Sequence, residues 1–493
     1  MRERRQTARM LCSALVQGLA LVLCLANLGC RLPSTQPRIC RHCTNSIGRS
    51  KVVISQVIQD TAQQTLTHPF RSTGQFIRGT VRNTCTMTYD VIGKRVVIPL
   101  LSSPPPLQHD RPKLCRQQLE KALQKKRTGK LHPAHLQLIF DGGASLQKLE
   151  ALIDSAQRNI NVLMYLWDSD AIGWSLARRL ARQAKIMAKG CSDAITVRVV
   201  VDGGGNLFHS APGNKADSAV NGVVVWLSNQ PHVRVIRGRN AFAQFDHRKL
   251  VLVDEQIAWS GGRNFTLSSF FEYRDLSYTV RGPILAELRA TFARAWKRSG
   301  GKSLPKISTC DCTEEPVQAN ASARLIGTDP PIRDFKAALL TAVNHARHHI
   351  YLENPYLING ELIYRLIQAR RRGVDVRVIL SENAQSSLID RAAKPIINRL
   401  RRAGIRVFIY PGSTHAKAAS VDGRWAYIGT GNFDSLSMNR NYEVGLSISS
   451  GAVIQQLEQS LFQQDMRPEW EVIHPVSTNI LDHFSEMMAC LLL

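Results

Sequence analysis

The sequence predicts an α/β protein made of two similar halves, and three observations support this fold class. Helical and strand-like segments alternate along the chain from about residue 131 onward. The order of these segments returns in the second half of the chain. One pattern of five residues at fixed spacing also occurs once in each half. Strands that alternate with helices of ordinary length favour α/β layers around a largely parallel sheet.

The first half is expected to span residues 131–300. We predict that Ser145 caps its first helix, because apolar residues recur at helical spacing from 146 to 156. Residues 160–167 are apolar enough for a buried strand. A second helix is expected through 174–178 and is predicted to stop near Gly190, and residues 195–201 form the next predicted strand.

The second half is expected to span residues 323–470 and to repeat this order. It begins with a helix at 335–346 and a strand from 350, followed by a helix at 361–372 that stops at Gly373 and a strand at 374–380. The tripeptide Val-Arg-Val occurs at 197–199 and again at 376–378. Residues 301–322 are then the linker between the halves, and the chain is an internal duplication.

The composition limits the kinds of partner that this protein can bind. The 493 residues are 44% hydrophobic and 21% charged, which excludes a wholly disordered chain. Lys and Arg number 64 against 38 Asp and Glu, so the formal net charge is +26. This excess excludes an acidic carrier and favours partners that carry phosphate, either nucleic acid or anionic lipid.

The two ends of the chain carry possible membrane signals. Arginines in the first nine residues precede an apolar run at 10–28, so residues 1–30 are predicted to be a signal-like or membrane-anchor segment, with Cys30 as a lipidation candidate of the lipoprotein type. Residues 31–130 receive no function. The C-terminal tail, 471–493, ends in Cys490-Leu-Leu-Leu, which has the form of a prenylation box. We therefore expect a membrane-associated protein, held in a bacterial cell envelope through the N-terminal segment or on a host-cell membrane through Cys490.

The eleven cysteines do not predict a metal site. The close pairs Cys40/Cys43 and Cys310/Cys312 are about 270 residues apart, whereas a structural zinc site brings two such pairs together in sequence. No metal and no other cofactor is predicted.

The strongest signal is a pattern of His, Lys, Asp, Gly and Asn that is present twice. Such a pattern arises by chance in roughly one chain in ten thousand per copy at average composition. The first copy comprises His247, Lys249, Asp254, Gly261 and Asn264, and the second comprises His415, Lys417, Asp422, Gly429 and Asn432.

The spacing of this pattern predicts a phosphodiester site. Residues i and i+2 of a strand point to the same face, so each His projects together with its Lys. Asp254 and Asp422 suit the turn into a returning strand, where we assign them a structural role. We expect Gly261 and Gly429 to lie beside the histidines and leave room for a ligand. Two imidazoles, two ammonium groups and two amides then supply a nucleophile, an acid and positive charge for the phosphate oxygens.

A carboxylate follows each motif histidine at the same distance of 28 residues. These residues are Asp275 and Glu443, and each could accept a hydrogen bond from an imidazole Nδ1 and fix its tautomer. Glu272 is a neighbouring alternative in the first half. A surface ion pair of Asp275 with Arg274 or Arg281 is the competing interpretation.

The paired motifs resemble the phospholipase D superfamily over residues 135–465. Within it, the segments 245–249 (Phe-Asp-His-Arg-Lys), 273–276 (Tyr-Arg-Asp-Leu), 353–356 (Glu-Asn-Pro-Tyr) and 441–443 (Asn-Tyr-Glu) are similar to the bacterial cardiolipin synthase branch. The resemblance implies two α-β-α sandwich halves that form a pseudo-dimer with one active site between them. Gly262 and Thr430 stand where many members have Ser, which is expected to modulate the rate.

The resemblance also implies a two-step reaction without metal. His247 is expected to attack phosphorus and form a phosphohistidine, and His415 to protonate the leaving alcohol. The implied substrates are glycerophospholipids of membranes, and the products are phosphatidic acid or a cardiolipin-synthase-type lipid. A phosphodiesterase acting on nucleic acid is the alternative, and it is disfavoured because no groove of aromatic and basic residues is evident. No obligatory protein partner is inferred.

Overall fold

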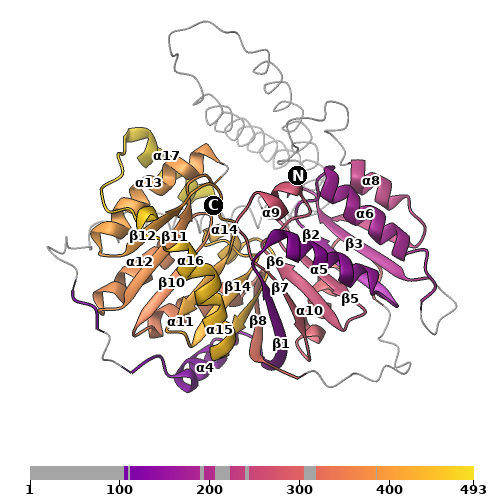
Figure 1. Cartoon of the computed structure of the whole chain (residues 1–493), viewed down its shortest axis with the longest axis horizontal. Coiled ribbons are helices and arrows are strands. Elements are labelled where there is room, and N and C mark those ends of the chain that lie inside the picture. The colour runs from indigo at the N-terminus through magenta and orange to yellow at the C-terminus, as the bar shows by residue number, and fades with distance from the viewer. Residues whose placement is uncertain are drawn as a thin grey trace, which may run out of the picture. The chain divides into compact units, whose positions relative to one another are not determined.

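The computed structural model describes residues 105–108, 112–188, 194–205, 222–238, 244–304, 318–384 and 386–492 (Figure 1). The chain divides into compact units at residues 1–78 and 79–493, and every described residue belongs to the second unit. The predictions for the N-terminal segment and Cys30 therefore lie outside the described residues, as do those for the cysteine pairs. Within the described ranges, no helix is both long and apolar enough to cross a membrane.

The described strands form one fifteen-stranded sheet, to which both halves contribute (Figure 1). Strands of the first half are β1 (Leu131–Ile139), β2 (Asn159–Met164), β3 (Thr196–Asp202), β4 (Val233–Gly238), β5 (Leu250–Val253), β6 (Ile257–Gly261) and β7 (Ser277–Arg281). Those of the second are β8 (Ala321–Asp329), β9 (Ile332–Arg333), β10 (His349–Glu353), β11 (Asp375–Ser381), β12 (Arg406–Tyr410), β13 (Ala418–Val421), β14 (Trp425–Gly429) and β15 (Glu443–Ile448). The halves join where β1 pairs antiparallel with β8.

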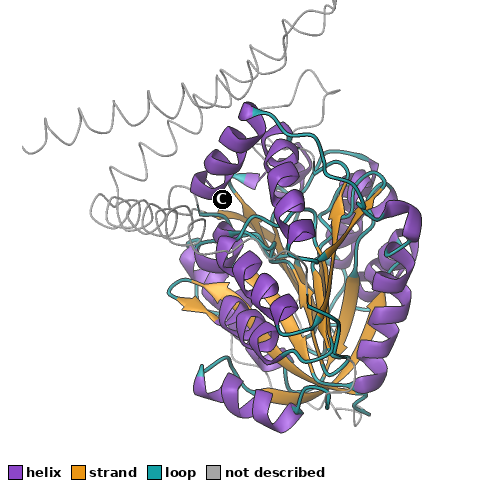
Figure 2. Ribbon diagram, turned by 90° about the vertical axis from the view of Figure 1, so that its left-hand side faces the viewer, coloured by secondary structure: helices purple, strands orange, loops and turns teal. Residues whose placement is uncertain are grey.

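Helices lie on both sides of this sheet (Figure 2). The described helices up to residue 298 are α4 (Arg116–Lys125), α5 (Gly142–Asp154), α6 (Ala171–Gln183), α8 (Gly222–Ser228), α9 (Leu267–Phe271) and α10 (Leu285–Arg298). The later ones are α11 (Asp334–His345), α12 (Gly360–Arg371), α13 (Ser387–Arg402), α14 (Ser435–Asn439), α15 (Gly451–Leu457), the π-helix η2 (Glu458–Phe462), α16 (Gln463–Asp465), the 3₁₀ turn η3 (Pro468–Trp470) and α17 (Ile480–Leu492).

Alternation along the strands divides the core between the two faces of the sheet. In β2, Val162 packs into the cluster that contains α5, α6 and α8, whereas its neighbour Leu163 packs into a second cluster on the other face. That second cluster takes in α10 and α15 and is shared by both halves. A third cluster fills the space beneath α11, α12 and α13, and α4 adds Leu119 and Leu123 to it. The α-β-α layers of a duplicated pseudo-dimer are therefore present.

The prediction of a largely parallel sheet is wrong. Only the pairs β2/β3, β3/β4, β10/β11 and β11/β12 among the described strands are parallel. Helical crossovers connect these strands, as parallel pairing requires. The motif hairpins β5/β6 and β13/β14 add antiparallel strands in each half, because short turns join successive strands there.

Two details of the predicted helices are also wrong. The first helix is capped by Asp141, whose carboxylate accepts the backbone N–H of Ala144 at 2.7 Å, and not by Ser145. Ser145 is buried inside α5, where its hydroxyl accepts a hydrogen bond from Nε1 of Trp259. The next helix, α6, ends at Gln183 and not near Gly190. The helices predicted at 335–346 and 361–372 and the strand predicted at 374–380 are confirmed within one residue.

The C-terminal tail is helical in its last part and packs on the second half. Helix α17 lies against α13, and its C-terminal end approaches the segment between β10 and α12. Cys490 is half-buried there, with Sγ 4.0 Å from the carbonyl oxygen of Ile358.

Candidate active site

Short backbone bridges between the halves build the centre of the site. The segment that carries His247 pairs with the segment just before Glu443, since His247 N–H donates to the carbonyl of Tyr442 at 3.0 Å. The reciprocal bridge joins the segment of His415 to Arg274, through a bond of 2.6 Å from His415 N–H to the Arg274 carbonyl. Each motif histidine is thereby aligned with the carboxylate of the opposite half.

The imidazole–carboxylate pairs cross between the halves as a result. Nδ1 of His247 lies 3.1 Å from Oε1 and 3.2 Å from Oε2 of Glu443. Nδ1 of His415 lies 2.8 Å from Oδ2 of Asp275. Both carboxylates are buried. A carboxylate on Nδ1 holds the neutral ring as the Nδ1–H tautomer and leaves the Nε2 lone pair for chemistry.

The competing interpretations of the first carboxylate are wrong. Asp275 has no exposed surface, so it makes no surface ion pair. Arg274 instead donates from Nε to Asp465 at 2.8 Å. Glu272 is exposed at the end of α9.

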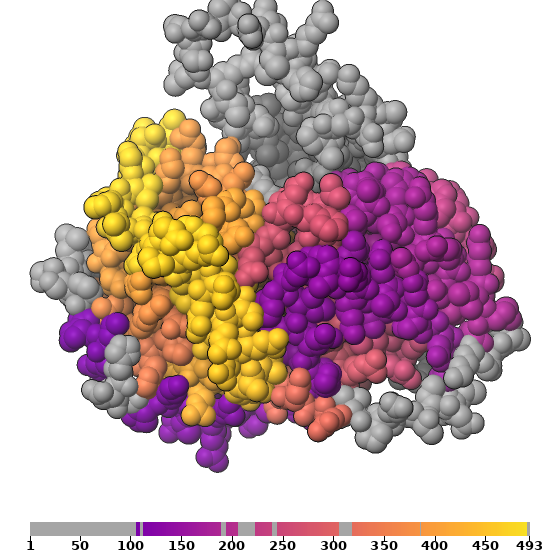
Figure 3. Space-filling model, in the orientation of Figure 1, coloured from indigo at the N-terminus to yellow at the C-terminus, as the bar shows by residue number. Residues whose placement is uncertain are grey.

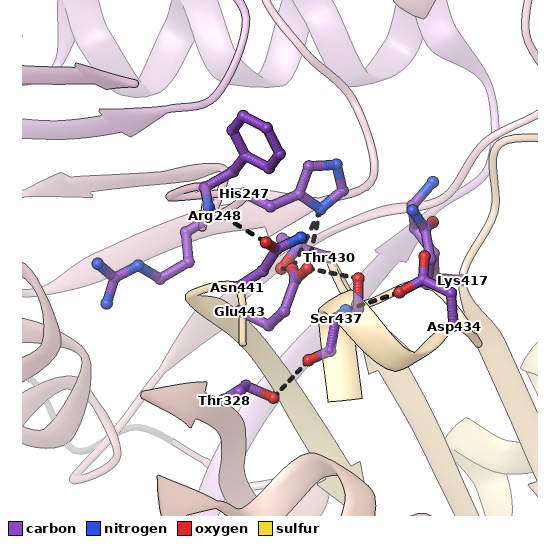
Figure 4. A network of polar contacts seen from close by, with 12 residues as sticks. His247, Arg248, Thr328, Lys417, Thr430, Asp434, Ser437, Asn441 and Glu443 are labelled. Carbon is purple, nitrogen blue, oxygen red and sulfur yellow. Dashed lines mark hydrogen bonds and ion pairs between the residues drawn. The ribbon is translucent and has the colours of Figure 1, made fainter. Parts of the chain in front are cut away.

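The two carboxylates are held by different neighbours. Glu443 accepts hydrogen bonds from the hydroxyls of Thr430, at 2.5 Å, and Ser437, at 2.7 Å, in addition to that of His247 (Figure 4). The Ser437 carbonyl in turn accepts from Thr328. Sequence reasoning did not identify Ser437, because nothing in its local pattern distinguishes it from other helix residues.

At the position equivalent to Thr430, the first half has a glycine for a steric reason. A Cβ on Gly262 would lie 2.2 Å from Oδ1 of Asp275. Asp275 Oδ1 also accepts the backbone N–H of Leu276 at 2.7 Å. The absence of a side chain at 262 therefore makes room for the carboxylate that orients His415.

The two motif lysines are buried beside the histidines. Lys249 donates from Nζ to the carbonyl of His247 at 2.7 Å, and Lys417 donates to that of His415 at 2.6 Å. The ring of Tyr165 lies over Lys249, with Nζ 4.7 Å from the ring centre, and packs edge-on against His247. Each ammonium group keeps two further N–H groups that can bind phosphate oxygens.

The motif asparagines contribute buried amide groups. Asn432 donates from Nδ2 to the hydroxyl of Tyr356 at 2.9 Å. The Oδ1 atoms of Asn264 and Asn432 are buried and accept no hydrogen bond from any described residue. Because the two ends of an amide are interchangeable by a flip, these groups can serve a ligand as donor or acceptor. Tyr356 belongs to the segment 353–356, which resembles the cardiolipin synthase branch. That resemblance did not predict a role for Tyr356 itself.

Burial dominates the electrostatics of the site. It lowers the pKa of Lys249 to about 7 and that of Lys417 to about 8, while Glu443 and Asp275, respectively, act in the opposite direction. Burial also lowers the pKa of His415 to about 3, and Lys417 adds to this effect. Both imidazoles are therefore neutral at pH 7 before an anion binds, since burial lowers the pKa of His247 as well.

The carboxylates remain charged despite their burial. Burial alone raises the pKa of Glu443, but His247 and Lys249 lower it below its ordinary value. His415 and Lys417 do the same for Asp275. A bound phosphodiester anion would offset the two ammonium charges, and its charge would raise the pKa of the imidazoles toward the range useful for acid catalysis.

The motif aspartates lie in the turns, as predicted, and bind backbone. Oδ1 and Oδ2 of Asp422 accept the N–H groups of Arg347, His348 and His349 at 2.9 Å and that of Leu114 at 3.0 Å. Asp254 accepts three successive N–H groups, from 157 to 159, in the same way. Each Asp has a positive φ, so it closes the hairpin and also fixes the start of β2 or β10.

The expected role of the motif glycines is wrong. A Cβ on Gly261 would lie 2.3 Å from the carbonyl oxygen of Leu276, and one on Gly429 would lie 2.6 Å from Cα of Gly445. These glycines allow the neighbouring strand to approach and do not clear space for a ligand.

Among the described residues, no group of three His, Cys, Asp or Glu side chains could hold a metal ion.

Comparison with known proteins agrees with this geometry. The family described as "Cardiolipin synthase, PLD-like domain" matches residues 149–296 and 339–466. Cardiolipin synthase A of Serratia proteamaculans is 28% identical over 328 residues, which cover 64% of this chain and 65% of that protein. Cardiolipin synthase A of Pseudomonas entomophila is 29% identical over 66% of this chain and 67% of its own length. The match thus leaves about a third of each relative uncovered.

A solved structure shares the fold. Phosphatidylserine synthase of Haemophilus influenzae superimposes with a TM-score of 0.54 at 12% sequence identity, over 72% of this chain and 92% of that one. The family match covers more than half of the chain and includes both copies of the crossed histidine motif. The chain belongs to the phospholipase D superfamily of phosphodiesterases and phosphatidyltransferases, through two copies of its cardiolipin synthase-like domain.

Proposed function

We propose that this protein is a phospholipase D-type phosphatidyltransferase that acts on glycerophospholipids. The observation that carries the proposal is the crossed pair of imidazoles, each fixed by a buried carboxylate, beside two buried ammonium groups. Nε2 of His247 attacks phosphorus, and the bond from phosphorus to the headgroup oxygen breaks. His415, which takes up a proton on Nε2 once the bound phosphodiester anion has raised its pKa, gives that proton to the headgroup oxygen. His415 then accepts a proton from water or an alcohol, whose oxygen displaces His247 from phosphorus.

The names of the relatives support a phosphatidyl acceptor that is itself a lipid alcohol. The two relatives described above are both named cardiolipin synthase A. By analogy, the second step transfers the phosphatidyl group to an alcohol on another lipid, and water competes for the same intermediate. The positive charge of the chain also suits a polyanion, so nucleic acid is the second substrate class to test.

The experiment is lipid mass spectrometry after incubation with mixed phospholipid vesicles, with and without glycerol. Cardiolipin or another exchanged phosphatidyl lipid is the expected product. Phosphatidic acid alone would establish a hydrolase in place of the transferase. No change in any lipid, with degradation of added single-stranded DNA, would replace the proposal with the nuclease. A His247→Ala, His415→Ala double variant controls for contaminating activity.

Membrane association through one end of the chain is part of the proposal. Cys490 and the apolar run at 10–28 are the two attachment candidates. Prenylation of Cys490 requires its thiol to leave the contact with Ile358, and one lipid chain gives only marginal anchoring. If the lipid is the anchor, Cys490→Ser should release the protein from membranes of eukaryotic cells. Unchanged association would assign anchoring to the N-terminal segment.

A further inference from the structure

The first two turns of helix α17 bury two acidic side chains and expose four apolar ones, with His483 exposed among them. Asp482 and Glu486 are 1% and 5% exposed. Ile480, Leu481 and Phe484 are 80%, 55% and 54% exposed, and one turn further on Met487 is 38% exposed. We call these four apolar side chains the α17 outer face. A helix at a protein surface normally buries its apolar stripe, so this orientation is reversed.

Ion pairs with α13 hold the helix in this orientation. Asp482 lies 3.3 Å from Nη1 of Arg391 and 3.9 Å from Nζ of Lys394. One turn later, Glu486 pairs with Arg399. Turning the helix over would remove both acidic groups from their partners. The apolar outer face is thus a fixed feature of the fold.

The C-terminal end of α17, beyond the outer face, approaches the active site. At the C-terminal end of α17, Cys490 contacts the carbonyl of Ile358. The N–H of Ile358 donates to the carbonyl of Phe433 at 3.2 Å, and Phe433 follows Asn432 of the second motif. The helix therefore ends two contacts away from a site residue.

A second pair of exposed apolar side chains borders the site on the first half. Helix α9 begins three residues after Asn264, and its Leu267 and Phe271 are 42% and 58% exposed. Both helices lie toward the same end of the sheet in Figure 1, and the segment that contains α17 reaches the surface in Figure 3. Exposed apolar groups thus lie on both halves, those of α9 close in sequence to Asn264.

The charges around the outer face favour a bilayer surface over a protein partner. Arg391 and Lys394 remain 39% and 41% exposed at its edge, where they can meet lipid phosphates, and the whole chain carries +26. Thirteen residues are too few to span a membrane but suit a helix that lies in the interfacial plane. Four side chains also form a patch well below the ~800 Å² per partner of a stable protein interface.

We propose that the α17 outer face, with Leu267 and Phe271 of α9, inserts into the surface of an anionic phospholipid bilayer and sets the active site against its headgroups. The proposal rests on the proposed function, because it assumes a substrate that stays in the membrane. It assigns to α17 a role in substrate access and none in bond making. Docking of this kind works together with either terminal anchor and requires neither.

Local fluorescence quenching tests the contact directly. A Phe484→Trp variant of the full chain is mixed with anionic vesicles that contain phospholipids brominated on their acyl chains, and Gln124→Trp on α4 is the matched control. Relative to the parent protein, which has seven tryptophans of its own, the variant at 484 should gain bromine-dependent quenching and the variant at 124 should not. No bromine-dependent quenching at 484 would overturn the proposal.

Kinetic measurements test membrane docking by α17 separately from phosphatidyl transfer at the active site. Phe484→Asp should weaken turnover of vesicle phospholipid about tenfold, the value of one buried aromatic side chain, and leave turnover of a monomeric short-chain phospholipid unchanged. Phe484→Leu should restore vesicle turnover. Equal losses on both substrates would overturn the docking role. Quenching at 484 without turnover of either lipid by the parent protein would retain the docking surface and reject the function.

Discussion

Nδ1 of His247 lies 3.1 Å from Oε1 of Glu443, although the two residues belong to opposite halves of the duplicated chain. His415 and Asp275 repeat the relationship in the other direction. Neither half therefore holds both members of a motif histidine–carboxylate pair. This exchange explains why two copies of the motif occur in one chain around one site.

The charge of Glu443 should be essential for the rate. Glu443→Gln keeps the size of the side chain but no longer fixes His247 as the Nδ1–H tautomer, so we expect kcat to fall roughly 10²- to 10⁴-fold. The measurement is kcat, KM and the pH profile of kcat/KM. Glu272→Gln, at an exposed position that follows α9, is the control and should leave all three unchanged. An unaltered kcat in Glu443→Gln would remove the carboxylate from the mechanism.

Deprotonation of Lys249 should cause the fall of kcat/KM at alkaline pH. The pKa of Lys249 is about 7 and lies below its ordinary value, so the ammonium form is present below this pH and disappears as the pH rises through it. We expect kcat/KM to decline above about pH 7. Lys249→Arg keeps its charge at higher pH and should move the decline upward by a unit or more, even if the maximum is lower. An unchanged profile would exclude Lys249 as its source.

Gly262 should be sensitive to the smallest side chain. In Gly262→Ala, the new methyl group would lie 2.2 Å from Oδ1 of Asp275. This distance is too short, so the carboxylate must turn away from His415. We expect kcat to fall at least tenfold with little change in KM. Thr430→Ser, at the equivalent position, keeps the hydroxyl that binds Glu443 and serves as the matched control. Similar kcat values for the two variants would contradict this explanation.

Asp422 should contribute to stability and not directly to chemistry. Asp422→Ala leaves four backbone N–H groups without their acceptor, and each buried group costs about 1–3 kcal/mol. We expect a free energy of unfolding lower by roughly 3 kcal/mol or more. Asp254→Ala should cost less, because Asp254 binds three such groups and is only half-buried. Denaturant unfolding measures both, and a larger loss for Asp254 would contradict the assignment.

The sequence was sufficient to predict the duplication, the motif residues and the two carboxylates. Periodicity and fixed spacing act within a short stretch of chain, and they located His247, His415 and both lysines. The crossed pairing could not be predicted, because equal offsets within each half say nothing about how the halves face each other. The backbone bridges at Tyr442 and Arg274 decide it, and both are long-range contacts.

The errors have the same origin. Ser145 matched a helix cap locally, yet Asp141 takes the cap because Gly142 and Gly143 begin the helix despite their low helix propensity. Gly261 has a glycine pattern that fits a ligand site, but the backbone of the adjacent strand fills that space. The supporting hydroxyl of Ser437 depends on the packing of α14 over β15, which no local pattern encodes.

Trapping of the covalent intermediate tests the central claim most directly. His415→Ala, incubated briefly with a phosphatidyl ester of p-nitrophenol, should accumulate a phosphatidyl group on His247, detected by mass spectrometry of the digested protein. The nitrophenolate leaves without the proton that His415 supplies, whereas the second step still lacks its base. The same treatment of His247→Ala should give no adduct. An adduct on His415 in the latter variant would reverse the two roles. No adduct on any histidine, while the parent protein turns over phospholipid, would contradict a phosphohistidine mechanism at the shared site.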